Sequence, residues 1–226
     1  MGYFISKKSL KGTGDPFGIR RATLSIIKIC LEKKIDFNFN ELFSYLTKIY
    51  QKQNIRVDME YETLYEFFKK RIEILFEESG FNSGVIKASF MDSALNPHLI
   101  FLKVNKLQKF LKTKDGISFL KAFKRLDSLN EECQSSDINE DLLNQKEEIQ
   151  FYKFLCLMDK KLNNSVKESL LDDNSIINKT TLIINNFFDN VIVNDDNMKL
   201  RMNRKKLINH LHKVLNKSYN FSFLLN

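Results

Sequence analysis

The side chains most often used for catalysis or metal binding are few in this sequence and poorly spaced for either role. The three histidines are His98, His210 and His212. His210 and His212 are two residues apart, so on a helix they point about 200° apart and cannot easily share a metal ion. No two of the three cysteines form a CxxC pair, which argues against a zinc site and a disulfide framework. We therefore expect no catalytic group and no bound metal in this chain.

Two other local patterns bear a weak likeness to ligand sites. Lys11-Gly12-Thr13-Gly14 looks like part of a phosphate-binding loop, but no GxxxxGK[ST] follows a strand, so a flexible lead into a helix is the better interpretation. Asp172-Asp173 and Asp195-Asp196 are adjacent carboxylates, yet neither pair has a histidine neighbour or a glycine-bearing calcium loop. Helix capping explains both pairs more simply.

The composition favours a helical protein that attracts polyanions. Hydrophobic residues make up 43% of the chain, and 36 lysines and arginines against 28 acidic residues give a formal charge of +8. Such a charge favours phosphate contacts, although lysine-rich surfaces also serve solubility alone. Only two prolines and seven glycines interrupt 226 residues, which favours long helices over a turn-rich β architecture.

Apolar residues recur three and four positions apart along most of the chain, the pattern of a helix with one buried face. Asp15 is expected to cap the first helix, with Pro16 at its first position, and Gly80 to end the third. The expected helices cover 16–34, 41–52, 61–79, 83–94, 97–111, a segment after Asp115-Gly116, 147–162, 175–190, and a last one capped by Asp195 or Asp196 that ends near Leu215. Only 191–193 is expected to be extended, so nothing builds a sheet.

The predicted fold is therefore an all-α helical bundle. Residues 1–14 are expected to be the end of a preceding domain or a linker, and 15–226 a single helical domain with a polar loop near 134–144. No apolar run approaches the roughly 18 residues of a membrane span, so no membrane partner is expected. Cys30 and Cys156 lie among apolar neighbours and are interpreted as core thiols of a protein in the reducing cytoplasm; Cys133 completes the set.

Three motifs in collinear order resemble those of one family. Residues 11–22, KGTGDPFGIRRA, are similar to GSKDPFALRRA of the bacterial glycyl-tRNA synthetase β subunit. Residues 110–125 resemble that family's FLxTxDGxxLLxAxKR, and 187–194, 200–204 and 221–226 resemble its closing FFDxVMVN, LRxNRL and DxSLLQ. The chain departs from the pattern at Gly14, where the family has lysine, and at Gly18-Ile19, where it has Ala-Leu.

The resemblance to the C-terminal part of this subunit implies a role in an α₂β₂ ligase that joins glycine to its tRNA. It implies a helical anticodon-binding domain like that of arginyl-tRNA synthetases. The expected partners are glycine tRNA, the α subunit and the remainder of the β subunit, whose larger part would precede this segment. ATP and Mg²⁺ would be used at the α subunit, and no cofactor is expected here. The second interpretation is a helical interaction or scaffold remnant without specific tRNA binding.

Cations on the outer helix faces are the expected RNA contacts. The candidates are Arg20, Arg21, Lys121, Lys124, Arg125, Lys199, Lys205, Lys206 and Lys213. Charge reversal at Lys205 and Lys206 is predicted to weaken tRNA binding and to flatten its salt dependence. Exposed aromatic rings that stack on bases are also expected in such domains, but nearly every phenylalanine fits a core stripe and none can be chosen.

Arg204 is expected to have a structural role. At about 100° per residue it falls within the apolar stripe of the last helix, about 40° from Leu200. A buried guanidinium needs a carboxylate or carbonyl partner. We therefore predict that Arg204 pairs with Asp189 or with a nearby backbone carbonyl.

Overall fold

The structure, a computed structural model, describes residues 15, 17–36, 38–57, 60–90, 95–131, 137–164 and 170–225. These residues form helices and no strand, so the all-α prediction is confirmed. The predicted phosphate-loop likeness at 11–14, the linker at 1–14, Pro16 and Cys133 lie outside the described residues. The likeness to the arginyl-type domain stays a prediction.

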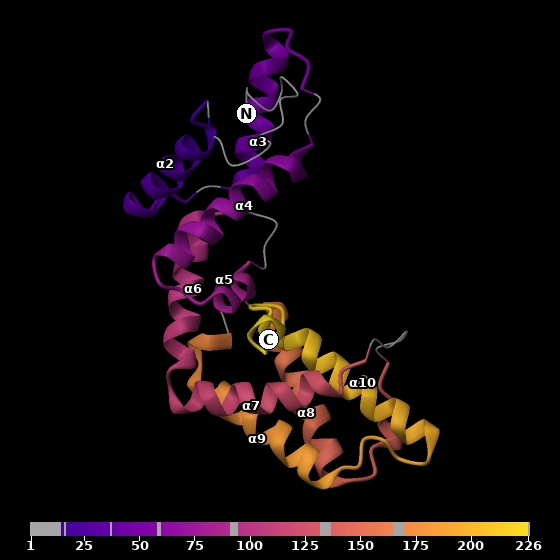
Figure 1. Cartoon of the computed structure of the whole chain (residues 1–226). Helices are drawn as coiled ribbons and strands as arrows, with labels where there is room; N and C mark the ends of the chain where they lie inside the picture. Colours follow the sequence, from indigo (N-terminus) through magenta and orange to yellow (C-terminus); the bar gives the residue numbers. More distant parts are fainter. Residues whose placement is uncertain are drawn as a thin grey trace. The chain divides into compact units, whose positions relative to one another are not determined.

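The chain divides into two compact units, 1–105 and 106–226, whereas the sequence predicted one domain over 15–226. The boundary falls inside helix α6 (Pro97–Leu111), whose apolar periodicity continues unbroken and contains no sequence signal for a division. The helices of the two units can be followed by colour in Figure 1.

Unit 1 is built on α2 (Ile19–Glu32), α3 (Phe39–Lys52), α4 (Tyr61–Glu78) and α5 (Ser83–Ser89), followed by the first part of α6. Helix α4 packs against α2, α3 and α5, and supplies Ile72 and Phe76 to the core. Gly80 follows α4 with a φ of 87°, a left-handed conformation that glycine adopts without strain, as predicted for a helix end.

The start of α2 differs from the prediction. The helix begins at Ile19 after Gly18, whose φ of 66° sharply redirects the backbone. Asp15 nevertheless accepts backbone N–H bonds, because its carboxylate oxygens lie 3.2 Å from the nitrogens of both Arg20 and Arg21. The carboxylate therefore serves the first turn from outside the helix rather than from its N-cap position.

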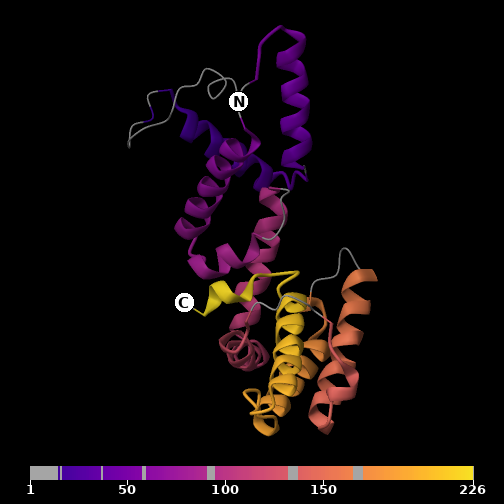
Figure 2. The same ribbon diagram turned by 90° about the vertical axis from the view of Figure 1, so that its right-hand side faces the viewer.

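Unit 2 contains α7 (Lys114–Ser128), α8 (Lys146–Asn164), α9 (Asn174–Asn190) and α10 (Met198–Leu215), with short 3₁₀ turns η1 (Glu140–Leu142), η2 (Leu170–Asp172) and η3 (Phe221–Leu224). Helix α8 packs against α9 and α10, and α7 packs against α9 and η3. The pair of α8 and α10 is seen side by side in Figure 2. Asn197 caps α10, because its side chain accepts a 3.0 Å hydrogen bond from Lys199 N. The predicted caps, Asp195 and Asp196, are therefore wrong by one or two residues.

The core of unit 2 is rich in phenylalanine. The ring of Phe221 lies 5.1 Å from Phe119 and 5.5 Å from Phe123, which joins the C-terminal turn η3 to α7. Phe151 of α8 and Phe187 of α9 meet at 4.6 Å. Buried aromatic pairs of this kind fix the positions of the helices relative to one another within unit 2.

Candidate nucleic-acid interface

The turn between α6 and α7 is fixed by a cap and a close backbone contact. Thr113 caps α7: its Oγ1 accepts the Gly116 N–H at 3.0 Å and donates to the Phe110 carbonyl at 2.7 Å. A Cβ on Gly116 would lie 2.1 Å from that carbonyl oxygen, so only glycine permits this approach. The direction in which α7 leaves α6 is therefore set by Thr113 and Gly116.

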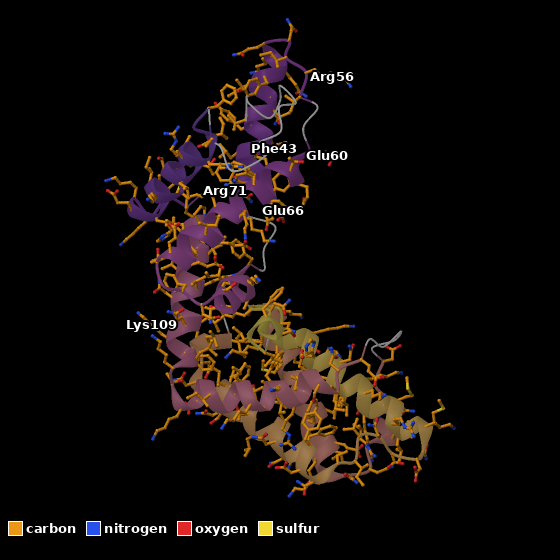
Figure 3. The ribbon with its side chains drawn as sticks, in the orientation of Figure 1. Phe43, Arg56, Glu60, Glu66, Arg71 and Lys109 are labelled. Atoms are coloured by element: carbon orange, nitrogen blue, oxygen red, sulfur yellow. The ribbon has the colours of Figure 1, made fainter. Side chains whose placement is uncertain are left out.

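This turn presents a set of lysines that we call the α6–α7 lysine face. Its members are Lys109, Lys112, Lys114, Lys121 and Lys124. All five are exposed, and in the described part of the chain none of their amines has an ion pair or a hydrogen bond. Figure 3 shows Lys109 projecting outward from α6. On α7, Lys114, Lys121 and Lys124 lie within about 80° of the helix circumference.

The face is strongly basic because acidic residues are nearly absent from it. Between 109 and 124 the sequence contains five lysines and a single acidic residue, Asp115. The opposite side of α7 is committed to the core through Phe119 and Phe123. Unpaired amines beside one another repel, and a polyanion relieves that repulsion while releasing its own counterions. The arrangement of these amines suits phosphate binding.

The structure separates the cations predicted on α7 into two kinds. Lys121 and Lys124 are exposed members of the lysine face. Arg125 is not: its Nη2 lies 2.7 Å from Asp189 Oδ1 and its Nη1 donates to Asn185 Oδ1 at 3.2 Å. Arg125 therefore ties α7 to α9, and its guanidinium is already occupied by protein groups.

The predicted cations of α10 are mostly engaged as well. Lys205 is only 15% exposed and its Nζ lies 2.6 Å from Glu131 Oε1. Lys206 donates to the carbonyl of Asp137 at 2.8 Å. Lys199 and Lys213 are exposed, but they lie at opposite ends of the helix. The structure thus gives α10 no continuous set of free amines.

The two predicted arginines of α2 belong to unit 1. Arg21 is exposed, but its Nη2 donates to the Asp15 carbonyl at 3.4 Å and its Nε lies 3.6 Å from the Asp15 carboxylate. Arg20 is half-buried at the first turn. The Arg21 side chain therefore helps to fix the start of α2 through Asp15.

Arg204 is buried and ion-paired, but with other partners than the predicted Asp189. Its Nε lies 2.6 Å from Glu148 Oε1, and its Nη1 lies 2.8 Å from both Asp195 Oδ2 and the Ile192 carbonyl. The pairing with Asp189 is wrong because that carboxylate binds Arg125. The predicted carbonyl contact is present. Glu148 is the missed partner, and its position at the first turn of α8 resembled an ordinary helix-capping acid.

The electrostatics of this cluster follow from its burial. Glu148 Oε2 also accepts the N–H groups of Asn144 and Gln145 at 2.9 and 2.8 Å, so both carboxylate oxygens are used. Burial alone disfavours the guanidinium charge, but the pairs with Glu148 and Asp195 outweigh it and raise the pKa of Arg204. The cluster joins α8, α10 and the loop before α10, and the guanidinium of Arg204 is buried away from any phosphate in solvent.

One cluster contains the residue types of a hydrolytic triad without its geometry. His212 Nε2 lies 2.8 Å from Asp127 Oδ1, and Ser222 Oγ donates to that same oxygen at 2.7 Å. In a triad the carboxylate and the hydroxyl occupy different nitrogens of the imidazole. Here both lie against Nε2, so His212 cannot relay a proton from Ser222, and the cluster instead holds η3 against α7 and α10.

In the residues that the structure describes, no group of three or more His, Cys, Asp or Glu side chains could hold a metal ion. No helix in the described ranges is long and apolar enough to cross a membrane. The α6–α7 lysine face is the feature of unit 2 whose charged groups have no ion pair or hydrogen bond in the described residues.

Sequence reasoning missed Lys109, Lys112 and Lys114. Their spacing of two and three residues across a predicted helix boundary gave no helical pattern that would have grouped them. The usable signal was local: these lysines and Lys121 and Lys124 surround the motif residues Thr113, Asp115 and Gly116 with hardly any acid.

Comparison with known proteins gives a consistent result. A family model described as the glycyl-tRNA synthetase beta subunit matches residues 1–91. The glycine–tRNA ligase beta subunit of Buchnera aphidicola subsp. Schizaphis graminum is 29% identical over 93% of this chain and 30% of its own length. That of Buchnera aphidicola subsp. Acyrthosiphon pisum is 30% identical over 93% of the chain and 31% of its own length. That of Rickettsia bellii is 29% identical over 99% and 32%. The chain spans about a third of the length of these relatives.

Proposed function

Because the chain is a homologue of the C-terminal part of the glycyl-tRNA synthetase β subunit, we propose that it binds tRNA during the synthesis of glycyl-tRNA. The proposed substrate is glycine tRNA, read through its anticodon region. The α subunit and the rest of a β subunit are the proposed protein partners. ATP and Mg²⁺ act at the α subunit, and this chain contributes binding rather than chemistry.

The observation that carries the proposal is the α6–α7 lysine face. Lys109, Lys112, Lys114, Lys121 and Lys124 are exposed along the end of α6, the turn and α7, and in the described residues none of their amines has an ion pair or a hydrogen bond. Phosphate contacts supply much of the affinity and fix the orientation of a nucleic acid, while base contacts supply the discrimination. The lysine face supports the first of these two roles.

The test is a titration of the whole chain with a glycine tRNA transcript and one non-cognate tRNA, at low and at physiological salt. We expect glycine tRNA to bind more tightly and to keep that preference at physiological salt. Equal binding of both tRNAs that physiological salt abolishes would contradict an anticodon-reading role and would favour a helical scaffold that no longer reads tRNA.

A matched pair of variants locates the surface. Lys114→Glu/Lys121→Glu reverses two charges seven residues apart on α7, and Lys153→Glu/Lys160→Glu reverses two exposed charges at the same spacing on α8. One phosphate contact at about 0.1 M salt contributes roughly tenfold in affinity, so the α7 variant is expected to lose about 100-fold and the α8 variant little. Equal losses would mean that only net charge matters and would contradict the assignment to the lysine face.

A further inference from the structure

Helix α3 of unit 1 is exposed along most of its length. Of its 14 residues only Phe39, the first, is buried. Phe39 lies 4.9 Å from the ring of Phe68, and Phe43 lies 5.3 Å from that of Tyr61, so the N-terminal half of α3 is held by α4. Beyond this contact α3 stands apart from the other helices of its unit, as Figure 2 shows. Among the described residues of unit 1, most of the surface of α3 is therefore uncovered.

Tyr45 is the more exposed of the two large hydrophobic residues that α3 leaves exposed, the other being Leu42. Its side chain is 63% exposed, more than any other aromatic side chain in the described residues. Two positions after Phe43, which faces α4, Tyr45 points about 200° away from it. No ring contact of Tyr45 is found in the part of the chain that the structure describes. A tyrosine presents a flat apolar ring with a polar tip, which suits contact with a nucleobase.

Two lysines share the surface with this ring. Lys48 and Lys52 follow Tyr45 by three and seven residues, so all three side chains lie within about 60° of the helix circumference. Both lysines are exposed, and neither has a carboxylate partner in the described residues. The one acid on this face is Glu41, a turn before Tyr45. The charge of the face is thus complementary to an anion, with the aromatic ring at its edge.

We propose that Tyr45, Lys48 and Lys52 form a second RNA contact, which binds an unpaired stretch of RNA. The ring of Tyr45 stacks on an exposed base, and the two amines contact the phosphates that flank it. Aromatic rings interleaved with cations are the usual way in which proteins hold single-stranded nucleic acid. The inference rests on the proposed function that the chain binds tRNA, and it adds a site in unit 1 that recognises unpaired bases.

The decisive variants act on the ring and leave the charge unchanged. We expect Tyr45→Ala to lower the affinity of the whole chain for an RNA stem-loop by about tenfold, the loss of one stacked base. The affinity for a blunt RNA duplex is expected to stay unchanged. Tyr45→Trp keeps a flat ring and introduces the only tryptophan of the chain. Its affinity should match the unaltered chain, and the stem-loop should quench its fluorescence while the duplex does not.

The lysines give an independent readout. Lys48→Glu/Lys52→Glu is expected to lower stem-loop affinity and to reduce the slope of log affinity against log salt by roughly two, whereas Tyr45→Ala leaves the slope unchanged. The matched control is Lys28→Glu/Lys87→Glu, which reverses two exposed charges elsewhere in unit 1 and is expected to lose much less.

The outcomes separate this inference from the proposed function. If Lys114→Glu/Lys121→Glu weakens tRNA binding while all α3 variants bind normally, the α3 site is wrong and the proposed function stands. If the unaltered chain binds neither tRNA nor stem-loop, both are wrong. If Tyr45→Ala weakens the stem-loop and the duplex equally, or if fluorescence does not change, stacking on unpaired bases is overturned. Unchanged RNA binding combined with weaker association with the α subunit would assign α3 to a protein partner instead.

Discussion

Helices α7 and α10 are both rich in cations, yet the structure uses these cations in opposite ways. On α10, Arg204 forms ion pairs with Glu148 and Asp195, and Lys205 forms an ion pair with Glu131. On α7, Lys114, Lys121 and Lys124 face solvent with no protein partner in the described residues. Similar sequence composition therefore produces a structural clamp on one helix and an open basic surface on the other.

The difference arises from where the acids lie, and most of them are distant in sequence. Glu148 reaches Arg204 from 56 residues away, and Glu131 reaches Lys205 from 74 residues away. In the part of the chain that the structure describes, Asp189 is the distant acid that pairs with a lysine or arginine of α7, and its partner is Arg125. Counting lysines along a helix thus cannot identify a phosphate-binding surface, because the fold decides which amines remain unpaired.

The largest expected effect on stability comes from breaking the ion pairs of Arg204 with Glu148 and Asp195, which we call the α10 clamp. Replacing Arg204 by Met leaves Glu148, which has no exposed surface, without its cation. Breaking a buried ion pair on one side costs about 3–5 kcal/mol, so Arg204→Met should lower the free energy of unfolding by that amount. The measurement is urea unfolding followed by circular dichroism.

Two variants sharpen this result. Lys213→Met removes an exposed cation of the same helix and should change stability by less than about 0.5 kcal/mol. Glu148→Met/Arg204→Met removes both buried charges and should recover part of the loss. Comparable destabilisation by Lys213→Met would show that the clamp has no special role.

A second, smaller effect is expected at the turn that directs α7. Gly116→Ala places a methyl group 2.1 Å from the Phe110 carbonyl oxygen, which forces backbone to move. Overpacking of this kind costs about 1–3 kcal/mol, against about 1 kcal/mol gained in helix propensity. We expect a net loss of stability together with weaker tRNA binding, measured by unfolding and by titration. Ser118→Ala, on the exposed side of α7, should be neutral or slightly stabilising, and equal behaviour of the two variants would contradict the close-contact argument.

The fold and the site were predictable to different degrees. Helices such as α4 and α6 were located within a residue because their apolar spacing and the end signals at Gly80 and Pro97 are local. The division at Asn105 and Lys106 could not be predicted, since the periodicity of α6 continues through it. The burial of Arg204 was predictable from its position in the stripe, but its partner was not, because contacts between helices distant in sequence leave no local pattern.

A third effect, smaller in stability, compares Lys205 with Lys121 directly. Lys205→Gln breaks a partly exposed ion pair with Glu131 and should cost less than about 1 kcal/mol, while Lys121→Gln should cost almost nothing. In tRNA affinity the order should reverse: Lys121→Gln loses roughly tenfold and Lys205→Gln little, because only Lys121 has a free amine. The measurements are urea unfolding and tRNA titration of both variants. A larger affinity loss for Lys205→Gln would contradict the assignment to the lysine face and would place the tRNA contact on α10.

The smallest effect is the pH dependence of the clamp. The Asn197 N–H and then the Arg204 guanidinium hold the pKa of Asp195 below its ordinary value of 3.8. When the pH falls below that ordinary value, Asp195 is protonated in the unfolded chain but still ionised in the folded chain. Acid therefore favours unfolding. The stabilising contribution is therefore complete near neutral pH and is lost as the pH falls through the lowered folded pKa. Asp195→Asn should flatten the loss of stability between pH 5 and pH 2, as urea unfolding at several pH values would measure. Asp196→Asn, at an exposed neighbouring position, is the control; if both variants flatten the profile equally, the effect belongs to general charge at the start of α10 and not to the clamp.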